Sequence, residues 1–319
     1  MTDVPKKERM WLAERASISF LKLGETREAV DGTRKFVFLL ADGLAVESVA
    51  IPDQDRLTLC LSTQVGCTLD CAFCLTGRMG LLRNLRFHEI IGQVLAVQRQ
   101  PGQQALTNIV LMGMGEPLAN LDAVEEAVSR LTNRRWGLGF SPRRITLSTA
   151  GLAPRLTRVA KMGINLAVSL NASSEIQRSR LMPAANHTYS LKSLVDACKK
   201  YPLKPHRRLT FEYVLLRGEN DSVEDAERVA DLVRGIRCKV NLIPFNEFPE
   251  SPFRRPSEEA VLRFQKILTG RGLDVFIRKS KGQDVLGACG QLGSLEPSLL
   301  KPQRKRSEHV KPEPVLASL

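Results

Sequence analysis

The sequence predicts an α/β protein built on a parallel sheet. From residue 56 onward, short apolar segments alternate with longer amphipathic ones. Hydrophobic residues make up 43% of the 319 residues, which is enough to bury a sizeable core. Alternating strand and helix units imply parallel strands covered by helices. Six or seven such units leave a choice between an open sheet and a full or partial barrel.

Seven segments have the short, β-branched, apolar character of buried strands. They are 56–62, 108–113, 144–149, 165–170, 208–216, 239–245 and 274–279. Five segments carry apolar residues at helical spacing, namely 87–100, 121–133, 190–201, 222–236 and 257–272. Ser222 and Ser257 are predicted N-caps, because a serine hydroxyl accepts hydrogen bonds from the free N–H groups of a first turn.

The N-terminal part predicts a small module. Residues 34–51 read as a β-hairpin whose turn is Ala41-Asp42-Gly43, and residues 6–30 are mixed and partly helical by pattern. We expect an N-terminal module at 1–52, a barrel with a C-terminal cysteine loop at 53–296, and a tail at 297–319. The tail is basic and contains proline, with little to bury, which predicts disorder.

Charge and hydropathy limit the class of protein. No apolar run approaches the roughly 18 residues of a membrane span, and the N-terminus lacks the apolar core of a secretory signal. We therefore expect a soluble, cytoplasmic protein with no membrane partner. Lys and Arg number 47 against 34 Asp and Glu, a net charge of +13. This excess favours nucleic acid as a partner, although spread-out basic residues also fit a merely solvated surface.

The strongest motif is a cysteine cluster. Cys67, Cys71 and Cys74 form a C-x3-C-x2-C pattern, and the total of seven cysteines does not suggest a secreted disulfide framework. A structural zinc site needs four ligands, and no fourth Cys or His is nearby. Three soft ligands on one loop suit a [4Fe–4S] cluster with one iron left open, and zinc remains the alternative.

This spacing, directly after the first strand of the βα series, resembles the radical S-adenosylmethionine (SAM) superfamily. Phe73 matches the aromatic residue usual before the third cysteine. The resemblance implies a partial (β/α)6 barrel preceded here by the small β-hairpin module. It also implies that SAM binds the open iron and is cleaved to a 5′-deoxyadenosyl radical. Ligand groups are then expected at the C-terminal ends of the strands.

Four further cysteines lie outside the cluster. Gly287 and Gly290 flank Cys289, which favours an accessible loop over a packed core, and thiolates are good methyl acceptors. Cys60 lies in the first strand of the series, where the simplest interpretation is a small buried hydrophobe. Cys198 and Cys238 have the same interpretation.

The whole pattern resembles the RlmN/Cfr family of radical SAM RNA adenine methyltransferases. The matching segments run from about residue 35 to 295: VESVAIP, DRLTLCLSTQVGC, CAFC, NIVLMGMGEPL, ITLSTAG, LAVSLNA, IPFNEFP and ACGQL. The resemblance implies an RNA adenine as substrate, and we expect adenine 2503 of 23S rRNA, methylated at carbon C2, together with adenine 37 of tRNAs as in RlmN. Carbon C2 of adenine is not nucleophilic, so a radical route is required.

The resemblance implies a role for particular residues. Cys289 would take a methyl group from one SAM, and a second SAM at Cys67, Cys71 and Cys74 would supply the radical. Cys60 would resolve the RNA adduct through a transient disulfide, and Glu47 would accept the adenine proton. SAM would be contacted by residues after the strands: Gly115, Glu116, Ser148, Ser169, Leu170, Asn171 and Asn246.

The implied partners are 23S rRNA, tRNA and an electron donor such as flavodoxin or ferredoxin. The protein itself is expected to be a monomer. Arg78, Arg83 and Arg86 are candidate RNA contacts, and a solvated face is an equal alternative. Only about 35 residues precede the hairpin, fewer than is common in the family. Methylation at carbon C8, as in Cfr, and a radical SAM enzyme with a small-molecule substrate remain alternatives. So does a non-enzymatic RNA-binding protein with structural zinc.

Overall fold

A computed structural model describes residues 4–15, 21–100, 102 and 104–293. The expected disordered tail at 297–319 lies outside these residues. Within them no helix is both long enough and apolar enough to cross a membrane.

The centre of the fold is a run of seven parallel strands that lie side by side in chain order. They are β4 (Arg56–Cys60), β7 (Asn108–Leu111), β8 (Ile145–Thr149), β9 (Asn165–Ser169), β10 (Leu209–Leu215), β11 (Cys238–Pro244) and β12 (Val275–Ile277). Each coincides with a predicted segment, so the parallel sheet is confirmed. The sheet remains open, since β12 lies at one of its edges.

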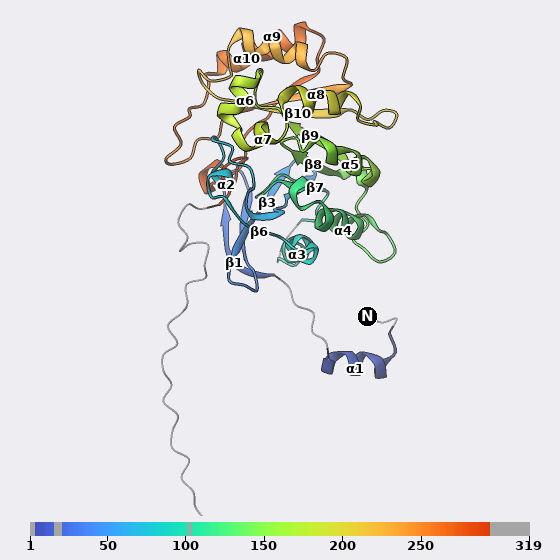
Figure 1. Ribbon diagram of the computed structural model, residues 1–319. Helices are drawn as coiled ribbons and strands as arrows, with labels where there is room; N and C mark the ends of the chain where they lie inside the picture. The colour runs from blue at the N-terminus through green and yellow to red at the C-terminus, as the bar shows by residue number, and fades with distance from the viewer. Residues whose placement is uncertain (1–3, 16–20, 101, 103, 294–319) are drawn as a thin grey trace, which may run out of the picture.

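Helices cover the outer face of this curved sheet (Figure 1). They are α3 (Phe87–Gln98), α4 (Leu121–Thr132), α5 (Leu156–Met162), α8 (Leu191–Lys199), α9 (Val223–Leu232) and α10 (Glu258–Gly270). The hydroxyls of Ser222 and Ser257 accept from the N–H groups of Asp225 and Ala260, which confirms both predicted N-caps. Helices α5, α6 (Glu175–Leu181) and α7 (Pro183–Thr188) were not predicted, because they are too short for a clear apolar period.

Strand alternation separates the core from the inner face of the barrel. On β10, Phe211 and Tyr213 are fully buried in the main hydrophobic core. Glu212 lies between them and therefore points to the opposite, inner face. The polar residues of the strands consequently face the space that the barrel encloses.

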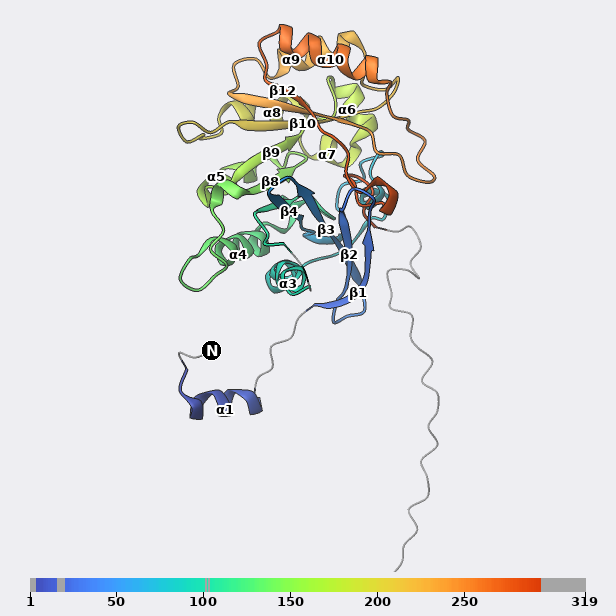
Figure 2. The ribbon, with the colours of Figure 1, turned by 180° about the vertical axis from the view of Figure 1, so that it is seen from behind.

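The predicted hairpin is confirmed as β2 (Arg34–Leu39) paired antiparallel with β3 (Ala45–Asp53). Strand β3 also pairs antiparallel with β4, so one sheet runs from the N-terminal strands into the barrel (Figure 2). The expected boundary between residues 52 and 53 falls within this sheet and stays a prediction. The partly helical pattern is borne out by α1 (Lys6–Arg15), none of whose residues is buried.

One strand in this region differs from the expectation. Residues 22–28 form β1 (Lys22–Glu28), which pairs with β2 at the other edge of the sheet. Its sequence, KLGETRE, is polar and almost wholly exposed. The strand is therefore held by backbone pairing to β2. Its sequence lacks the alternation of apolar and polar residues that predicts a strand.

Small elements complete the end of the barrel that holds the cysteine motif. Strands β5 (Gln64–Gly66) and β6 (Leu81–Asn84) form a separate antiparallel pair around α2 (Leu75–Arg78). Among the described residues there are also four short 3-10 helices: η2 (Pro142–Arg144) immediately precedes β8, and the others are η1 (Pro117–Asn120), η3 (Ala153–Arg155) and η4 (Gln283–Val285).

Candidate active site

The cysteine motif is a loop closed at its base by β5 and β6. The N–H of Cys67 donates to the carbonyl of Gly80 at 3.1 Å, and the N–H of Cys74 donates to the carbonyl of Cys71 at 3.0 Å. Helix α2 follows at once and packs so closely that a Cβ on Gly77 would lie 2.9 Å from the backbone nitrogen of Cys71. The loop is thus held by backbone contacts on both sides.

The three thiols lie close enough to one another to interact electrostatically. Cys71 interacts electrostatically with both Cys74 and Cys67, and burial raises the pKa of all three, that of Cys67 to about 12. The N–H of Leu69 donates to the Sγ of Cys67 at 3.4 Å. Buried thiols with raised pKa values are stable as thiolates when a cationic metal centre binds them, and the N–H donor to Cys67 also stabilises a thiolate. Among the described residues no three His, Cys, Asp or Glu side chains converge as a site for a single metal ion.

Gly66 makes this loop testable. Its φ is +76°, and a Cβ there would lie 1.8 Å from the carbonyl oxygen of Gly80. We expect Gly66→Ala to separate β5 from β6 beside Cys67. The reconstituted protein should therefore lose most of its iron. Gly80→Ala is the matched control, because Gly80 also has a positive φ (+70°) but faces open space. It should cost only about 1–2 kcal/mol of backbone strain and keep the iron. Iron analysis after anaerobic reconstitution decides the matter, and equal iron contents would contradict the expectation.

Glu116 lies beside the cysteine loop at the end of the second barrel strand. Its two carboxylate oxygens accept from the N–H groups of Leu118 (2.9 Å) and Ala150 (2.8 Å). Burial raises the pKa of Glu116, and its charge acts on Cys67 and Cys71. The preceding Gly115 has φ +101°, and a Cβ there would lie 2.6 Å from Gln64. Both predicted residues therefore lie against the motif loop.

A row of polar side chains crosses the inner face of the barrel. The hydroxyls of Ser148 and Ser169 are 3.2 Å apart on neighbouring strands. Glu212 is directly opposite Ser169 in the strand register and opposite Asn241 on its other side, and Asn241 Nδ2 donates to Glu212 Oε1 at 2.9 Å. Burial raises the pKa of Glu212. Sequence reasoning missed Glu212 and Asn241, although Glu212 is the one charged residue within the apolar segment 209–216.

The backbone and side chains that follow β9 are engaged within the protein. The N–H of Leu170 donates to the carbonyl of Glu212 at 2.9 Å. Asn171 has φ +54°, its Oδ1 accepts from the N–H of Val214 at 2.9 Å, and its Nδ2 donates to the sulfur of Met182. SAM contacts from Leu170 and Asn171 stay predictions.

Cys289 lies on a loop that returns from β12 to the cysteine motif. Asn246 Nδ2 donates to the carbonyl of Cys289 at 3.1 Å, while Asn246 Oδ1 accepts from Gln283 at 2.8 Å. The N–H of Leu75, in α2, donates to the carbonyl of Gly290 at 2.8 Å. Figure 2 shows this red segment beside the N-terminal strands and α2. Asn246 in this arrangement positions the Cys289 loop, and its predicted SAM contact stays a prediction.

The structure brings Cys60 and Cys289 together. Cys60 is the buried last residue of β4; burial raises the pKa of its thiol, and a charge on Cys289 raises it further. Cys289 is exposed to solvent, yet surrounding protein atoms and Glu212 raise its pKa, whereas Arg278 lowers it. A charge on Cys74 also raises the pKa of Cys289. An accessible thiol thus lies near both a buried thiol and the cysteine motif.

Glu47 reaches the same region from β3. Its Oε1 accepts from Lys35 Nζ at 3.2 Å, and its Oε2 accepts from the N–H of Gly293 at 2.9 Å, four residues beyond Cys289. The hydroxyl of Ser62 donates to the backbone carbonyl of Glu47 at 2.5 Å. Burial raises the pKa of Glu47, and Lys35 opposes this shift. The carboxylate is therefore fixed at the base of the Cys289 loop.

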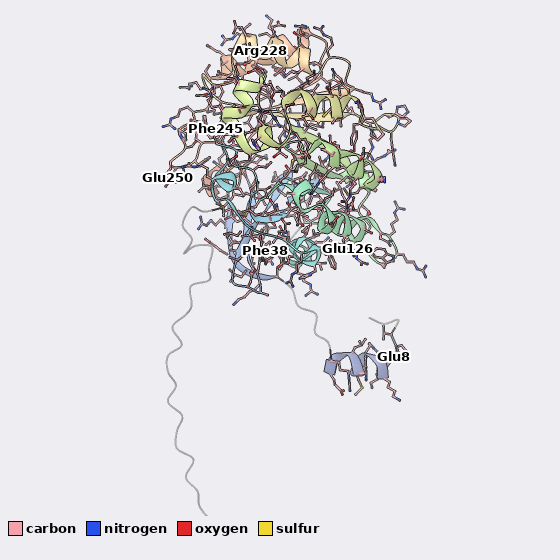
Figure 3. The ribbon with its side chains drawn as sticks, in the orientation of Figure 1. Glu8, Phe38, Glu126, Arg228, Phe245 and Glu250 are labelled. Carbon is pink, nitrogen blue, oxygen red and sulfur yellow. The ribbon has the colours of Figure 1, made fainter. Side chains whose placement is uncertain are left out.

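The other singled-out residues divide by environment. Arg83 donates from two nitrogens to Glu89, both at 2.8 Å, and also pairs with Asp42. Arg78 donates to the carbonyl of Glu250 at 3.1 Å; Figure 3 labels Glu250 at the edge of the molecule. Contacts of Arg78, Arg83 and Arg86 with RNA stay predictions. Cys198 is buried on α8 and Cys238 is half-buried on β11, so the expectation of burial is confirmed for Cys198.

The chain is similar in sequence to proteins of known family. Residues 61–233 match the radical SAM superfamily. "Dual-specificity RNA methyltransferase RlmN" of Desulfosudis oleivorans is 50% identical over 296 residues, which cover 92% of this chain and 80% of the relative. The protein of the same name from Geobacter sulfurreducens is 50% identical over 304 residues, covering 95% and 82%. The chain belongs to the RlmN family of RNA methyltransferases.

Solved structures agree with the family. A radical SAM methyltransferase from Sphaerobacter thermophilus superposes with a TM-score of 0.85 at 45% identity, over 91% of this chain and 86% of that one. The hydrogenase maturase HydG, at 10% identity and a TM-score of 0.51, shares the fold alone. The predicted partial radical SAM barrel is confirmed. As a member of the family, the chain is a SAM-dependent radical methyltransferase that uses a [4Fe–4S] cluster.

Proposed function

We propose that this enzyme methylates carbon C2 of adenine 2503 in 23S rRNA and of adenine 37 in tRNAs through a methylated Cys289. The observation that carries the proposal is that an accessible thiol, Cys289, lies within electrostatic range of a buried thiol, Cys60, on a loop whose Gly293 binds a buried carboxylate, Glu47. The printed name of the relatives, dual-specificity RNA methyltransferase, supports RNA as the substrate. The net charge of +13 suits contacts with phosphates.

The cofactor site of the proposal comprises the cysteine motif and the polar strand ends. Cys67, Cys71 and Cys74 would hold the cluster, and when bound the cluster and SAM supply a 5′-deoxyadenosyl radical. Glu116 and the Ser148–Ser169 pair lie where SAM would bind, beside the thiols and on the inner face respectively. The proposed SAM contacts are the predicted ones: Gly115, Glu116, Ser148, Ser169, Leu170, Asn171 and Asn246.

Cys289 and Cys60 have successive roles. The Cys289 sulfur takes the methyl group of one SAM, and S-adenosylhomocysteine leaves. A second SAM is consumed when a hydrogen is removed from that S-methyl group. The resulting carbon radical adds to adenine, which links Cys289 to RNA; Glu47 takes the proton from the substituted carbon, and the unpaired electron of the adduct would return to the cluster. The Cys60 thiolate then attacks the Cys289 sulfur, so that an S–S bond forms, the S–CH2 bond breaks and the released carbon takes up a proton to become the methyl group of the RNA. Each turnover therefore ends with a disulfide that must be reduced.

Glu47 is the proposed base for the adenine proton. Glu47→Gln keeps the size of the side chain and one acceptor oxygen but cannot accept a proton, so we expect RNA methylation to fall by about 10²–10⁴-fold. Methylation of Cys289 itself should persist, because Glu47 has no part in that step. Glu126→Gln, an exposed change on α4 (Figure 3), is the control. Loss of Cys289 methylation in Glu47→Gln would instead indicate a structural role.

The raised pKa of Glu47 also fixes the sign of a pH effect. A base must be deprotonated to act, so activity should fall with decreasing pH at values above the ordinary glutamate range. The opposite sign holds for stability: a carboxyl with a raised folded pKa stabilises the fold most at low pH, and this contribution is lost as pH rises. A pH profile of single-turnover RNA methylation tests the acid limb, which should be absent from the residual activity of Glu47→Gln.

The site of methylation is tested by product analysis. RNA treated with the reconstituted enzyme and digested to nucleosides should yield 2-methyladenosine, from both a 23S rRNA fragment and a tRNA. 8-Methyladenosine would overturn the C2 assignment in favour of Cfr-like chemistry. The proposal includes a monomer that works in the cytoplasm, where both RNAs occur, with flavodoxin or ferredoxin as electron donor.

A further inference from the structure

Arg178 is a fully buried arginine at the C-terminal ends of two barrel strands. Its Nη1 donates to the carbonyl of Leu170, after β9, at 2.7 Å, and its Nη2 donates to the carbonyl of Ala150, after β8. Its Nε has no hydrogen-bond partner. In the part of the chain that the structure describes, no carboxylate lies within ion-pair distance of this guanidinium.

Such a charge is costly to bury without a counter-charge. Two carbonyl oxygens supply partial negative charge only, and burial lowers the pKa of Arg178. A buried cation of this kind indicates that an anion completes its surroundings when the site is loaded. We therefore expect an anionic group to bind near the guanidinium of Arg178.

Arg178 interacts electrostatically with the cysteine motif. The charges of Arg178 and Cys71 interact, and this is the largest attraction on the arginine. The N–H of Ala72 donates to the carbonyl of Leu181 at 3.0 Å, which ties the motif loop to α6, the helix that carries Arg178. The guanidinium therefore lies within electrostatic range of Cys71, on a helix that is hydrogen-bonded to the motif loop.

A single residue, Ala150, links this cation to Glu116. The N–H of Ala150 donates to Glu116 and the carbonyl of Ala150 accepts from Arg178. The two buried side chains are therefore both hydrogen-bonded to the backbone of one residue directly after β8.

We propose that Arg178 is the fixed positive counter-charge of the cluster at Cys67, Cys71 and Cys74, and that it raises the cluster's reduction potential. The inference rests on the proposed cluster ligands. An oxidised [4Fe–4S] cluster with three thiolate ligands is an anion, and reduction adds a further electron. A nearby buried cation stabilises the reduced form more than the oxidised form, because Coulomb energy grows with charge and with low local polarity. Arg178 is in this sense a positioning and electrostatic residue.

The test is the reduction potential of the cluster in four reconstituted proteins without SAM. Arg178→Gln removes the charge but keeps a donor for the carbonyls, and Arg178→Lys keeps the charge but loses the planar fork. Arg207→Gln is the matched control, because Arg207 donates to the carbonyl of Gly163 near the opposite end of β9. The dissociation constant of SAM is measured in parallel by equilibrium dialysis.

We expect the potential to become more negative in Arg178→Gln, to stay nearer the wild-type value in Arg178→Lys, and to be unchanged in Arg207→Gln. An unchanged potential in Arg178→Gln, or equal shifts in both Arg178 variants, would overturn the proposal. If Arg178→Gln fails to hold iron while Arg178→Lys loads fully, the charge requirement stands; failure of both shows a structural role and overturns it.

Two outcomes distinguish a role of Arg178 at the cluster from a role in SAM binding and from failure of the proposed function. An unchanged potential with weaker SAM binding in Arg178→Gln alone would assign the arginine to the SAM carboxylate and overturn the cluster assignment. A wild-type protein that takes up no [4Fe–4S] cluster would refute the proposed function itself. A loaded wild-type protein with insensitive potentials would refute the inference alone.

Discussion

Cys60→Ala is expected to become covalently attached to its RNA substrate and to stop there. In the proposed sequence, the bond between the Cys289 sulfur and the adenine-linked carbon is broken only by attack of the Cys60 thiolate. Cys60 is the buried thiol whose pKa responds to Cys289, so the structure offers it as the internal nucleophile. Without it, each protein should accumulate about one adduct and no free methylated RNA.

Denaturing gel electrophoresis with labelled RNA measures this directly. Cys198→Ala is the matched control, because Cys198 is equally buried but lies on α8, on the outer side of the sheet. It should release product at the wild-type rate and give no adduct. A Cys60→Ala enzyme that continues to release methylated RNA would show that the second thiol has no part in resolution.

Cys289→Ala is expected to abolish methylation completely. The variant has no sulfur at the position that takes the methyl group, so neither the S-methyl form nor the RNA adduct can arise. Radical generation should survive, because Cys67, Cys71 and Cys74 are untouched. 5′-Deoxyadenosine should therefore still form slowly from SAM, while methylated RNA stays at background.

The double variant Cys60→Ala/Cys289→Ala provides the control for the first prediction. It should lose the adduct that Cys60→Ala alone accumulates, since Cys289 is the attachment point. Methylated RNA from Cys289→Ala would place this chain with radical SAM enzymes that need no methyl-carrying cysteine.

Much of the fold follows from local patterns. Each parallel strand was predicted because β-branched and apolar residues fill it, and Ser222 and Ser257 mark helix starts through their hydroxyls. Strand β1 was missed because it is an edge strand with polar side chains on both faces. Strands β5 and β6 are too short for any period, and they form because they pair with each other around the cysteine loop.

The site divides in the same way. Local sequence motifs reveal the cysteine motif, Cys289 and the residues at the strand ends. Asn241, in contrast, is brought to the site only by its register opposite Glu212, which no local motif shows. Arg178 shares a helix face with Leu181 and Met182 by its spacing, a signal that could have placed it inside. Its partners, Leu170 and Ala150, come from separate strand ends, which no local pattern brings together.

The most direct test of the account is a peptide map of the anaerobically reconstituted enzyme incubated with SAM carrying an isotope-labelled methyl group. The account predicts that the peptide containing Cys289 gains the label on sulfur, and that the peptides containing Cys60 and Cys198 do not. A protein with an intact cluster that binds and cleaves SAM while Cys289 stays unlabelled would contradict the central claim that Cys289 carries the methyl group to RNA.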